Sequence, residues 1–176
     1  GKNYLQEAEQ KIQALADKSI VWHFIGPIQS NKTRRISELF DWVHSVDRFK
    51  IARRLHEQRP DALPALNILL QVNIENEPSK SGIGVDQILP LADRIFELPR
   101  VRLRGLMAIP AIHDDFEQQR KPLARMFQAF QQLQQQCSDC DTLSMGMSGA
   151  LESAVAEGAT MLRIGTAVFG PRPDTS

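Results

Sequence analysis

The sequence has two cysteines among 176 residues, no long apolar run and no excess of charge of either sign. Two cysteines cannot build the disulfide framework of small secreted proteins. The longest apolar runs, such as residues 65–70, are far shorter than the roughly 20 residues that a membrane span needs. Since 21 basic residues balance 21 acidic ones, no bulk charge attracts nucleic acid. We therefore expect one cytoplasmic domain over residues 1–176 that binds neither membrane nor nucleic acid.

The two cysteines form a C-x-x-C pair, Cys137 and Cys140, after a glutamine-rich segment. A zinc site needs further ligands nearby, and the sequence has none clustered there. The pair also does not lie at a strand-to-helix turn, where redox-active pairs occur. We expect two free thiols at the end of a helix and no metal site.

Apolar spacing predicts helices that alternate with short buried strands. The expected strands cover residues 20–25, 42–46, 66–73, 101–109, 141–145 and 160–169. The expected helices lie near residues 5–15, 33–40, 115–136 and 150–156, and two more begin after Asp47 and near Asp86. Alternating elements with apolar strands are typical of a parallel sheet that is buried on both faces.

Two α/β architectures fit this alternation, the doubly wound sheet and the (β/α)8 TIM barrel. The G-x-G-x-x-G fingerprint of dinucleotide-binding proteins is absent. Small hydroxyl and glycine residues follow the last two predicted strands, where barrels commonly bind a phosphate. We therefore predict a barrel, although eight strands are needed and the sequence shows only about six.

The stretch GMSGALESAVAEGATMLRIGTAVFG at residues 146–170 contains the strongest candidate site. Ser148 precedes a predicted helix and is a natural N-cap whose hydroxyl suits an anion. Arg163 lies inside a predicted strand, so it needs an acidic side chain or a ligand acceptor as partner. Gly165 permits close approach of a ligand to the backbone, and Thr166 adds a hydroxyl. A capped helix, a packing glycine and a salt-bridged arginine explain the same residues without a ligand.

Two further residues are candidates for contact with a ligand. His23 shares a strand face with apolar neighbours, which suits either a ligand contact or a hydrogen-bonded core histidine. Met107 lies near the end of a predicted strand and can line a pocket or simply pack. No Ser-His-Asp or paired-carboxylate arrangement is present, so we assign no catalytic residue.

Several motifs together resemble the pyridoxal 5′-phosphate homeostasis protein family. The segment at residues 146–170 is similar to the C-terminal part of that family. Asn3-Tyr4, W-H-F-I-G-P-I-Q-S-N-K at 22–32, S-K-S-G at 79–82 and R-G-L-M-A-I-P at 104–110 agree with it in the same order. The family resembles the barrel domain of alanine racemase, a (β/α)8 barrel that holds pyridoxal phosphate on a lysine at the end of its first strand.

The resemblance implies a protein that binds pyridoxal 5′-phosphate and serves vitamin B6 homeostasis as a carrier or regulator without catalytic turnover, monomeric at full length. In the family pattern, an arginine faces the pyridine nitrogen, and serine, glycine and threonine hold the phosphate. An arginine there keeps the nitrogen unprotonated and weakens the electron sink that carbanion chemistry requires. The expected cofactor contacts are Asn3, His23, Met107, Ser148, Arg163, Gly165 and Thr166.

The sequence departs from the family pattern in three places. The family's first helix, first strand and anchoring lysine precede the point where this chain starts, so we expect them to be absent and the chain to be a fragment. Lys2 replaces the family's glutamate. Gly149 and Ala150 replace an acidic pair, which favours an anion nearby. Lys2 is not a good substitute for the family's anchoring lysine. Lys32 and Lys80 are not good substitutes either, because they lie in loops after other strands.

Two other functions fit the same residues. A racemase-like pyridoxal phosphate enzyme would need a second acid or base, usually a tyrosine from another domain or subunit, and the only tyrosine here is Tyr4. A barrel enzyme that acts on a small phosphorylated substrate without pyridoxal phosphate would use the same phosphate-binding residues.

Overall fold

The five described strands form one parallel sheet in a computed structural model that describes residues 4–113, 115–147 and 149–170. The strands are β1 (His23–Phe24), β2 (Trp42–Val46), β3 (Leu66–Val72), β4 (Val101–Ala108) and β5 (Thr142–Ser144). They pair in sequence order, β1-β2-β3-β4-β5, and every pair is parallel. This order, with a helix between successive strands, is that of a partial (β/α)8 barrel.

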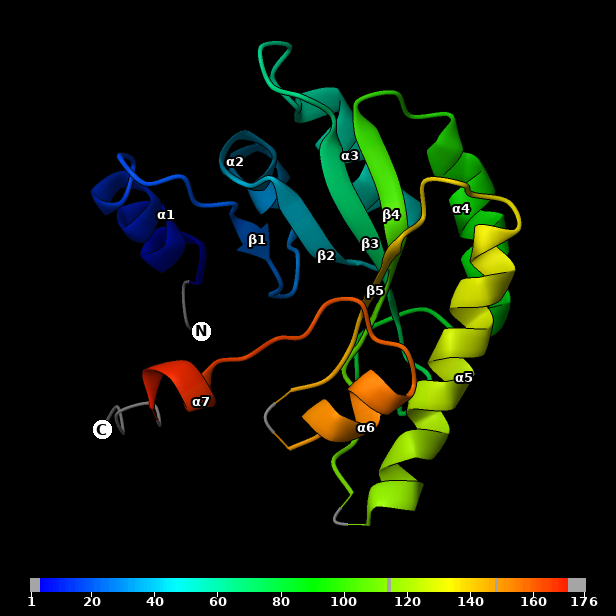
Figure 1. Ribbon diagram of the computed structural model, residues 1–176. Coiled ribbons are helices and arrows are strands. Elements are labelled where there is room, and N and C mark those ends of the chain that lie inside the picture. Colours follow the sequence, from blue (N-terminus) through cyan, green and yellow to red (C-terminus); the bar gives the residue numbers. More distant parts are fainter. Residues whose placement is uncertain (1–3, 114, 148, 171–176) are drawn as a thin grey trace.

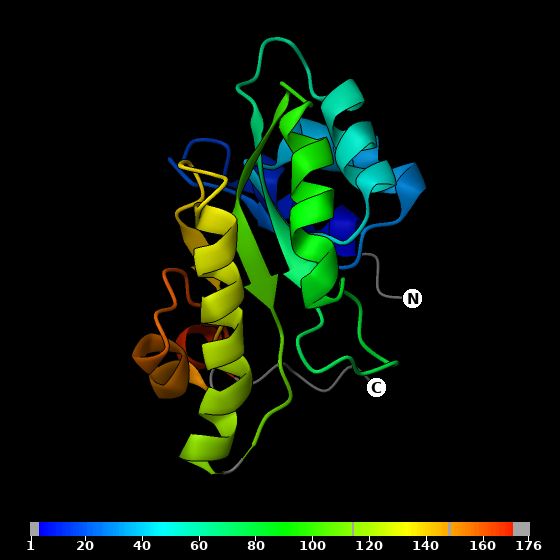
Figure 2. The same ribbon diagram turned by 90° about the vertical axis from the view of Figure 1, so that its right-hand side faces the viewer.

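The helices alternate with the strands as predicted. They are α1 (Tyr4–Ala14), α2 (Thr33–Leu39), α3 (Phe49–Gln58), α4 (Ile88–Phe96), α5 (Phe116–Gln134), α6 (Leu151–Ala156) and α7 (Thr166–Phe169), with 3-10 turns η1 (Ser30–Lys32) and η2 (Val85–Gln87). Helix α2 packs on α3 and α3 packs on α4. Figures 1 and 2 show α4 and α5 on the same side of β4, which both helices contact. Helices α2, α3, α4 and α5 therefore form a layer over one face of the sheet.

The central strand β3 has buried apolar side chains on both faces of the sheet. Its residues Ile68, Leu69 and Leu70 are each 0 % exposed, although consecutive side chains point to opposite faces. A continuous apolar run of this kind is typical of parallel strands between two layers. The core includes apolar residues of this strand and of α3, α4 and α5, and these helices contact its neighbours β2 and β4.

A glycine lets β4 approach β5 closely. Gly105 has a φ of +143°, and a Cβ there would lie 1.9 Å from the carbonyl oxygen of Thr142. The register between β3 and β4 shifts at the same place, between Ile68 and Leu69. Only a residue without a side chain fits this irregularity.

The predicted strand at residues 160–169 is wrong over most of its length. Met161 forms a single parallel bridge with Ser144, and the following residues turn into α7. The N–H of Arg163 still donates to the carbonyl of Gly146 at 3.1 Å. Among the described residues, no strand lies on the outer side of this segment, so no second ladder extends it. Strand β1 is shorter than predicted for the same reason.

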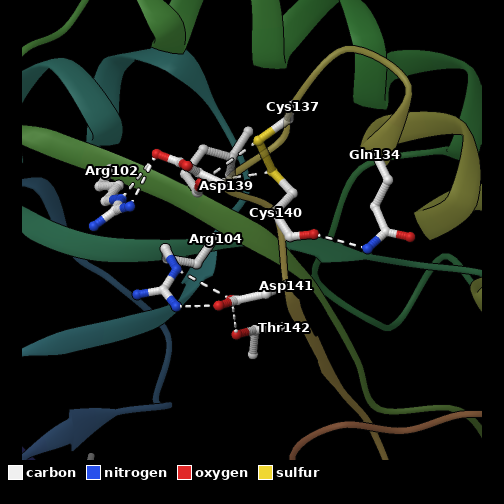
Figure 3. The surroundings of a disulfide bond; sticks show 9 residues. Arg102, Arg104, Gln134, Cys137, Asp139, Cys140, Asp141 and Thr142 are labelled. Carbon is white, nitrogen blue, oxygen red and sulfur yellow. Dashed lines mark hydrogen bonds and ion pairs between the residues drawn. A yellow bond between two sulfur atoms is a disulfide. The ribbon is translucent and has the colours of Figure 1, made fainter.

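The expectation of two free thiols is also wrong. Cys137 and Cys140 form a disulfide directly after α5, as Figure 3 shows. The N–H of Cys140 donates to the carbonyl of Cys137 at 3.1 Å, so the same short turn is also closed by a backbone hydrogen bond. The turn brings the two Cα atoms to 5.3 Å, a distance that spacing in the sequence does not reveal.

The described part of the chain has neither a metal-binding cluster nor a helix that could span a membrane. There, no three His, Cys, Asp or Glu side chains gather in a way that could hold a metal ion. The helices described are also too short or too polar to cross a membrane.

Candidate functional site

A cavity of about 610 Å³ opens beside β1 and β2 and next to the carboxyl ends of β4 and β5. It is lined by His23, Ile25, His44, Ile109, Met147, Met161, Leu162, Arg163, Ile164 and Gly165. Several of these residues directly follow the carboxyl ends of strands, where barrel proteins place their sites. The volume and the mixture of apolar walls with a few polar groups suit a small organic ligand.

Arg163 has neutral partners in place of the predicted acidic one. Its Nη1 donates to Ser144 Oγ and its Nη2 donates to the carbonyl oxygen of Ala108, both at 2.8 Å. Burial lowers the pKa of Arg163 to about 10. No carboxylate is paired with this guanidinium among the described residues, so its positive charge is available to an anion or a lone pair in the cavity.

Two histidines continue from Ser144 to the cavity wall. Ser144 Oγ lies 3.1 Å from His44 Nδ1, and His44 Nε2 lies 2.8 Å from His23 Nδ1. Burial, with the nearby charges of His23 and Arg163, lowers the pKa of His44 to about 3. Burial also lowers the pKa of His23, against the opposite effect of Asp41. Both histidines are therefore neutral at neutral pH.

The sequence left open whether His23 contacts a ligand or is a hydrogen-bonded core residue. The structure shows that it lines the cavity and is hydrogen-bonded as well. Its ring also stacks on Trp42, with ring centroids 5.4 Å apart and planes 7° apart. Sequence reasoning missed His44 and Ser144, although each is a polar residue inside a strand that was predicted to be buried.

Gly165 lines the cavity, and Thr166, the first residue of α7, follows it without lining the cavity itself. Both are exposed, and a Cβ added to Gly165 would meet no atom within 4 Å. A ligand group can approach the backbone here without a clash. The contact of these two residues with a phosphate stays a prediction.

The remaining predicted contacts lie outside this arrangement. Met107 is fully buried in β4, pairs with Ser144 across the sheet and does not line the cavity. Asn3 and Ser148 lie outside the described residues, so their roles stay predictions. The N-cap of α6 is Ala150, which places the start of this helix later than the sequence indicated for Ser148.

A smaller cavity of about 260 Å³ lies beside the loop that follows β3 and shares Ile25 and Ile109 with the larger one. Its wall includes Lys80, whose ammonium pairs with Glu77 at 2.6 Å. In the described part of the chain, no lysine lines the larger cavity. The described residues of the larger cavity therefore offer non-covalent contacts to a ligand.

Comparison with known proteins gives one consistent family. Residues 1–173 match the family described as "Alanine racemase, N-terminal domain". The pyridoxal phosphate homeostasis protein of Escherichia coli (strain K12) is 51% identical over 175 residues, which are 98% of this chain and 75% of that protein. The protein of the same name from Pseudomonas aeruginosa is 56% identical over 172 residues, with 98% and 74% covered.

Solved structures agree with the sequence comparison. PipY of Synechococcus elongatus PCC7942 without PLP has a TM-score of 0.87 at 36% identity, covering 94% of this chain and 79% of PipY. Its structure with PLP bound has a TM-score of 0.85 at 36% identity, covering 94% and 78%. Alanine racemase of Clostridium difficile 630 shares the fold, with a TM-score of 0.67 at 13% identity over 94% of this chain and 44% of the racemase.

Proposed function

Because the chain belongs to the pyridoxal phosphate homeostasis protein family, which has the fold of the alanine racemase N-terminal domain, we propose that it binds pyridoxal 5′-phosphate and serves the homeostasis of this cofactor. The observation that carries the proposal is the guanidinium of Arg163 in the wall of the 610 Å³ cavity, which has neutral partners and no carboxylate partner among the described residues. The PLP-bound structure of PipY, at 36% identity, supports the choice of ligand.

The residues of the cavity fit this cofactor. Arg163 can only donate hydrogen bonds, so it suits the lone pair of an unprotonated pyridine nitrogen. Gly165 leaves open space in the cavity wall, in which a phosphate would meet the backbone, and the exposed Thr166 next to it carries a hydroxyl. When bound, pyridoxal 5′-phosphate supplies an aldehyde that reacts with amines and a ring that withdraws electrons. A guanidinium that keeps the ring nitrogen unprotonated weakens that withdrawal.

We further propose that the chain carries or regulates the cofactor and does not catalyse turnover. Among the described residues that line the cavity there is no lysine, tyrosine or carboxylate to serve as acid or base. His44 lines the cavity, but its pKa of about 3 makes it a poor proton acceptor at neutral pH. The names of the relatives, which describe homeostasis and not an enzymatic activity, support the same proposal.

Equilibrium binding tests the proposal. We expect the chain to bind pyridoxal 5′-phosphate at one site, and also pyridoxine 5′-phosphate, which lacks the aldehyde and reports only non-covalent contacts. Arg163→Met should weaken both by roughly 10- to 100-fold, the value of a charge-assisted hydrogen bond. Arg125→Met is the matched control, because Arg125 is exposed on α5 and undergoes the same change of charge.

Three results would contradict parts of the proposal. Equal affinity of the Arg163→Met and Arg125→Met variants for the cofactor would show that the cofactor does not bind against Arg163 in this cavity. Racemisation or decarboxylation of an amino acid by the loaded protein would establish the racemase-like alternative. Binding of small phosphorylated substrates but of neither vitamer would establish the barrel enzyme that works without pyridoxal phosphate.

A further inference from the structure

A chain of hydrogen bonds crosses the inside of the half-barrel from Arg163 to the cavity wall. Arg163 Nη1 lies 2.8 Å from Ser144 Oγ on β5. Ser144 Oγ lies 3.1 Å from Nδ1 of His44 on β2. His44 Nε2 lies 2.8 Å from Nδ1 of His23 on β1. In a neutral histidine, either ring nitrogen can carry the hydrogen, so each of these bonds can be donated from either side. The positions of the hydrogens therefore decide whether His23 offers a donor or an acceptor to a ligand.

Arg163 sets the direction in which these hydrogen bonds are donated, because a guanidinium donates hydrogen bonds and never accepts them. Ser144 Oγ therefore accepts from Arg163 and must direct its own hydrogen elsewhere. Ser144 is 0 % exposed, and its hydroxyl has no other partner than Arg163 and His44 in the part of the chain that the structure describes. A buried hydroxyl hydrogen without an acceptor is costly. Ser144 therefore donates to His44 Nδ1.

The bond donated by Ser144 fixes the tautomers of His44 and then of His23. His44 accepts at Nδ1 and is neutral, because burial lowers its pKa to about 3, so its hydrogen is on Nε2. That Nε2–H donates to His23 Nδ1. His23 is left with its own hydrogen on Nε2, an atom with no hydrogen bond to another described residue. The stack on Trp42 and the bond to His44 fix the orientation of the His23 ring.

We propose that His23 presents an N–H donor to the ligand in the cavity and thereby selects a ligand with an anionic oxygen at that place. Ser144 and His44 are positioning residues that hold His23 in this form. The choice of ligand rests on the proposed function, since pyridoxal 5′-phosphate carries such oxygens on its ring and on its phosphate. The opposite direction would present a lone pair of His23 to the ligand and would leave the hydrogen of Ser144 unpaired.

The two directions give opposite tautomers of both histidines, which nitrogen NMR distinguishes. In the ¹⁵N-labelled chain without ligand at neutral pH, long-range ¹H–¹⁵N correlation should show a protonated Nε2 and an unprotonated Nδ1 in His23 and in His44. The loss of signals in His23→Gln and His44→Gln variants identifies the two rings. A protonated Nδ1 with a bare Nε2 in either ring would overturn the proposal.

A pair of variants separates positioning from general packing. Ser144→Ala removes the hydroxyl, so we expect His44 and His23 to become mixtures of tautomers. Ser45→Ala is the matched control on β2, since its hydroxyl donates to the carbonyl of Gly26 outside the chain of bonds, and it should leave both tautomers unchanged. Unaltered tautomers in a folded Ser144→Ala variant would refute the positioning role. If that variant does not fold, the wild-type spectrum still decides the direction.

Titration with pyridoxal 5′-phosphate then tests the donor against the ligand. The hydrogen on His23 Nε2 should shift downfield as the site fills. Binding that leaves this signal unmoved would overturn the assignment of His23 as the donor. Failure of the cofactor to bind at all would instead refute the proposed function, while the tautomers measured without ligand still decide the direction of the chain.

Discussion

Replacing Arg163 with methionine tests whether this arginine is held for a ligand or for the fold. Its pKa of about 10, against an ordinary value of 12.5, means that burial destabilises the charged side chain by roughly 3 kcal/mol. Methionine has a similar length and removes this cost. It also leaves the Ala108 carbonyl and Ser144 without a donor, at about 1–2 kcal/mol each, and Ser144 keeps its bond to His44. The two effects nearly cancel.

We therefore expect the free energy of unfolding of the ligand-free Arg163→Met protein to lie within about 2 kcal/mol of wild type, although its affinity for the cofactor falls. Urea unfolding followed by far-UV circular dichroism measures this difference. A residue that costs stability and serves binding is typical of a functional site.

Arg59→Met is the matched comparison. Arg59 is 5 % exposed and donates to the backbone carbonyls of Ser37, Phe40 and Pro64, so its loss strands three acceptors around the end of α2. We expect a loss of about 3–5 kcal/mol. If Arg163→Met destabilises the protein as much as Arg59→Met does, Arg163 is structural and the reasoning about the cavity is wrong.

Three more perturbations follow from the structure. The pKa of His44 is about 3 in the folded protein, against 6.5 in the unfolded chain. Between these two pH values only the unfolded chain binds the proton. The free energy of unfolding is therefore highest above pH 6.5 and falls by roughly 5 kcal/mol at most as the pH drops to 3. Urea titrations across this range should show a clearly weaker slope in His44→Gln, and an unchanged slope would contradict the assignment. Reduction of the Cys137–Cys140 disulfide, which spans only three positions, should cost about 2 kcal/mol in urea titrations with and without dithiothreitol, and global unfolding on reduction would disagree with this. Gly105→Ala places a Cβ against the Thr142 carbonyl at a φ of +143°, so we expect a loss of about 4 kcal/mol or more in thermal unfolding, whereas an unchanged Tm would mean that β4 and β5 can move apart.

Local sequence patterns predicted the central elements well. Strand β3 is mostly apolar, and it ends within one residue of its predicted limit. Helix α5 lies within its predicted range of 115–136, and the structure adds that Asp115 is its N-cap, since the carboxylate accepts from the N–H of Gln118 at 2.8 Å. Pro90 is tolerated because it is the third residue of α4. These features depend on residues that are close together in the chain.

The errors lie where distant residues decide. The segment after Met161 has strand-like composition, but a strand forms only where a neighbouring strand pairs with it, and composition does not supply that neighbour. The disulfide between Cys137 and Cys140 depends on the path of a turn and not on spacing alone. The bond between His44 and Ser144 joins residues 100 positions apart, so no local pattern could have paired them.

The candidate site was predictable in part for the same reason. Arg163 and Gly165 stood out because each is unusual in an apolar segment, and both line the cavity. His23 was a candidate on local grounds, but its partners were not visible in the sequence. Met107 was chosen for its place near a strand end, and the structure buries it against β5 and outside the cavity.

The location of bound pyridoxal 5′-phosphate decides whether the larger cavity is the cofactor site. We would soak or co-crystallise the chain with the cofactor and locate the phosphorus atom in a difference map. We expect the phosphate beside Gly165 and Thr166 and the pyridine nitrogen facing Arg163. A cofactor found in the smaller cavity beside Lys80, or only on the outer surface, would contradict it.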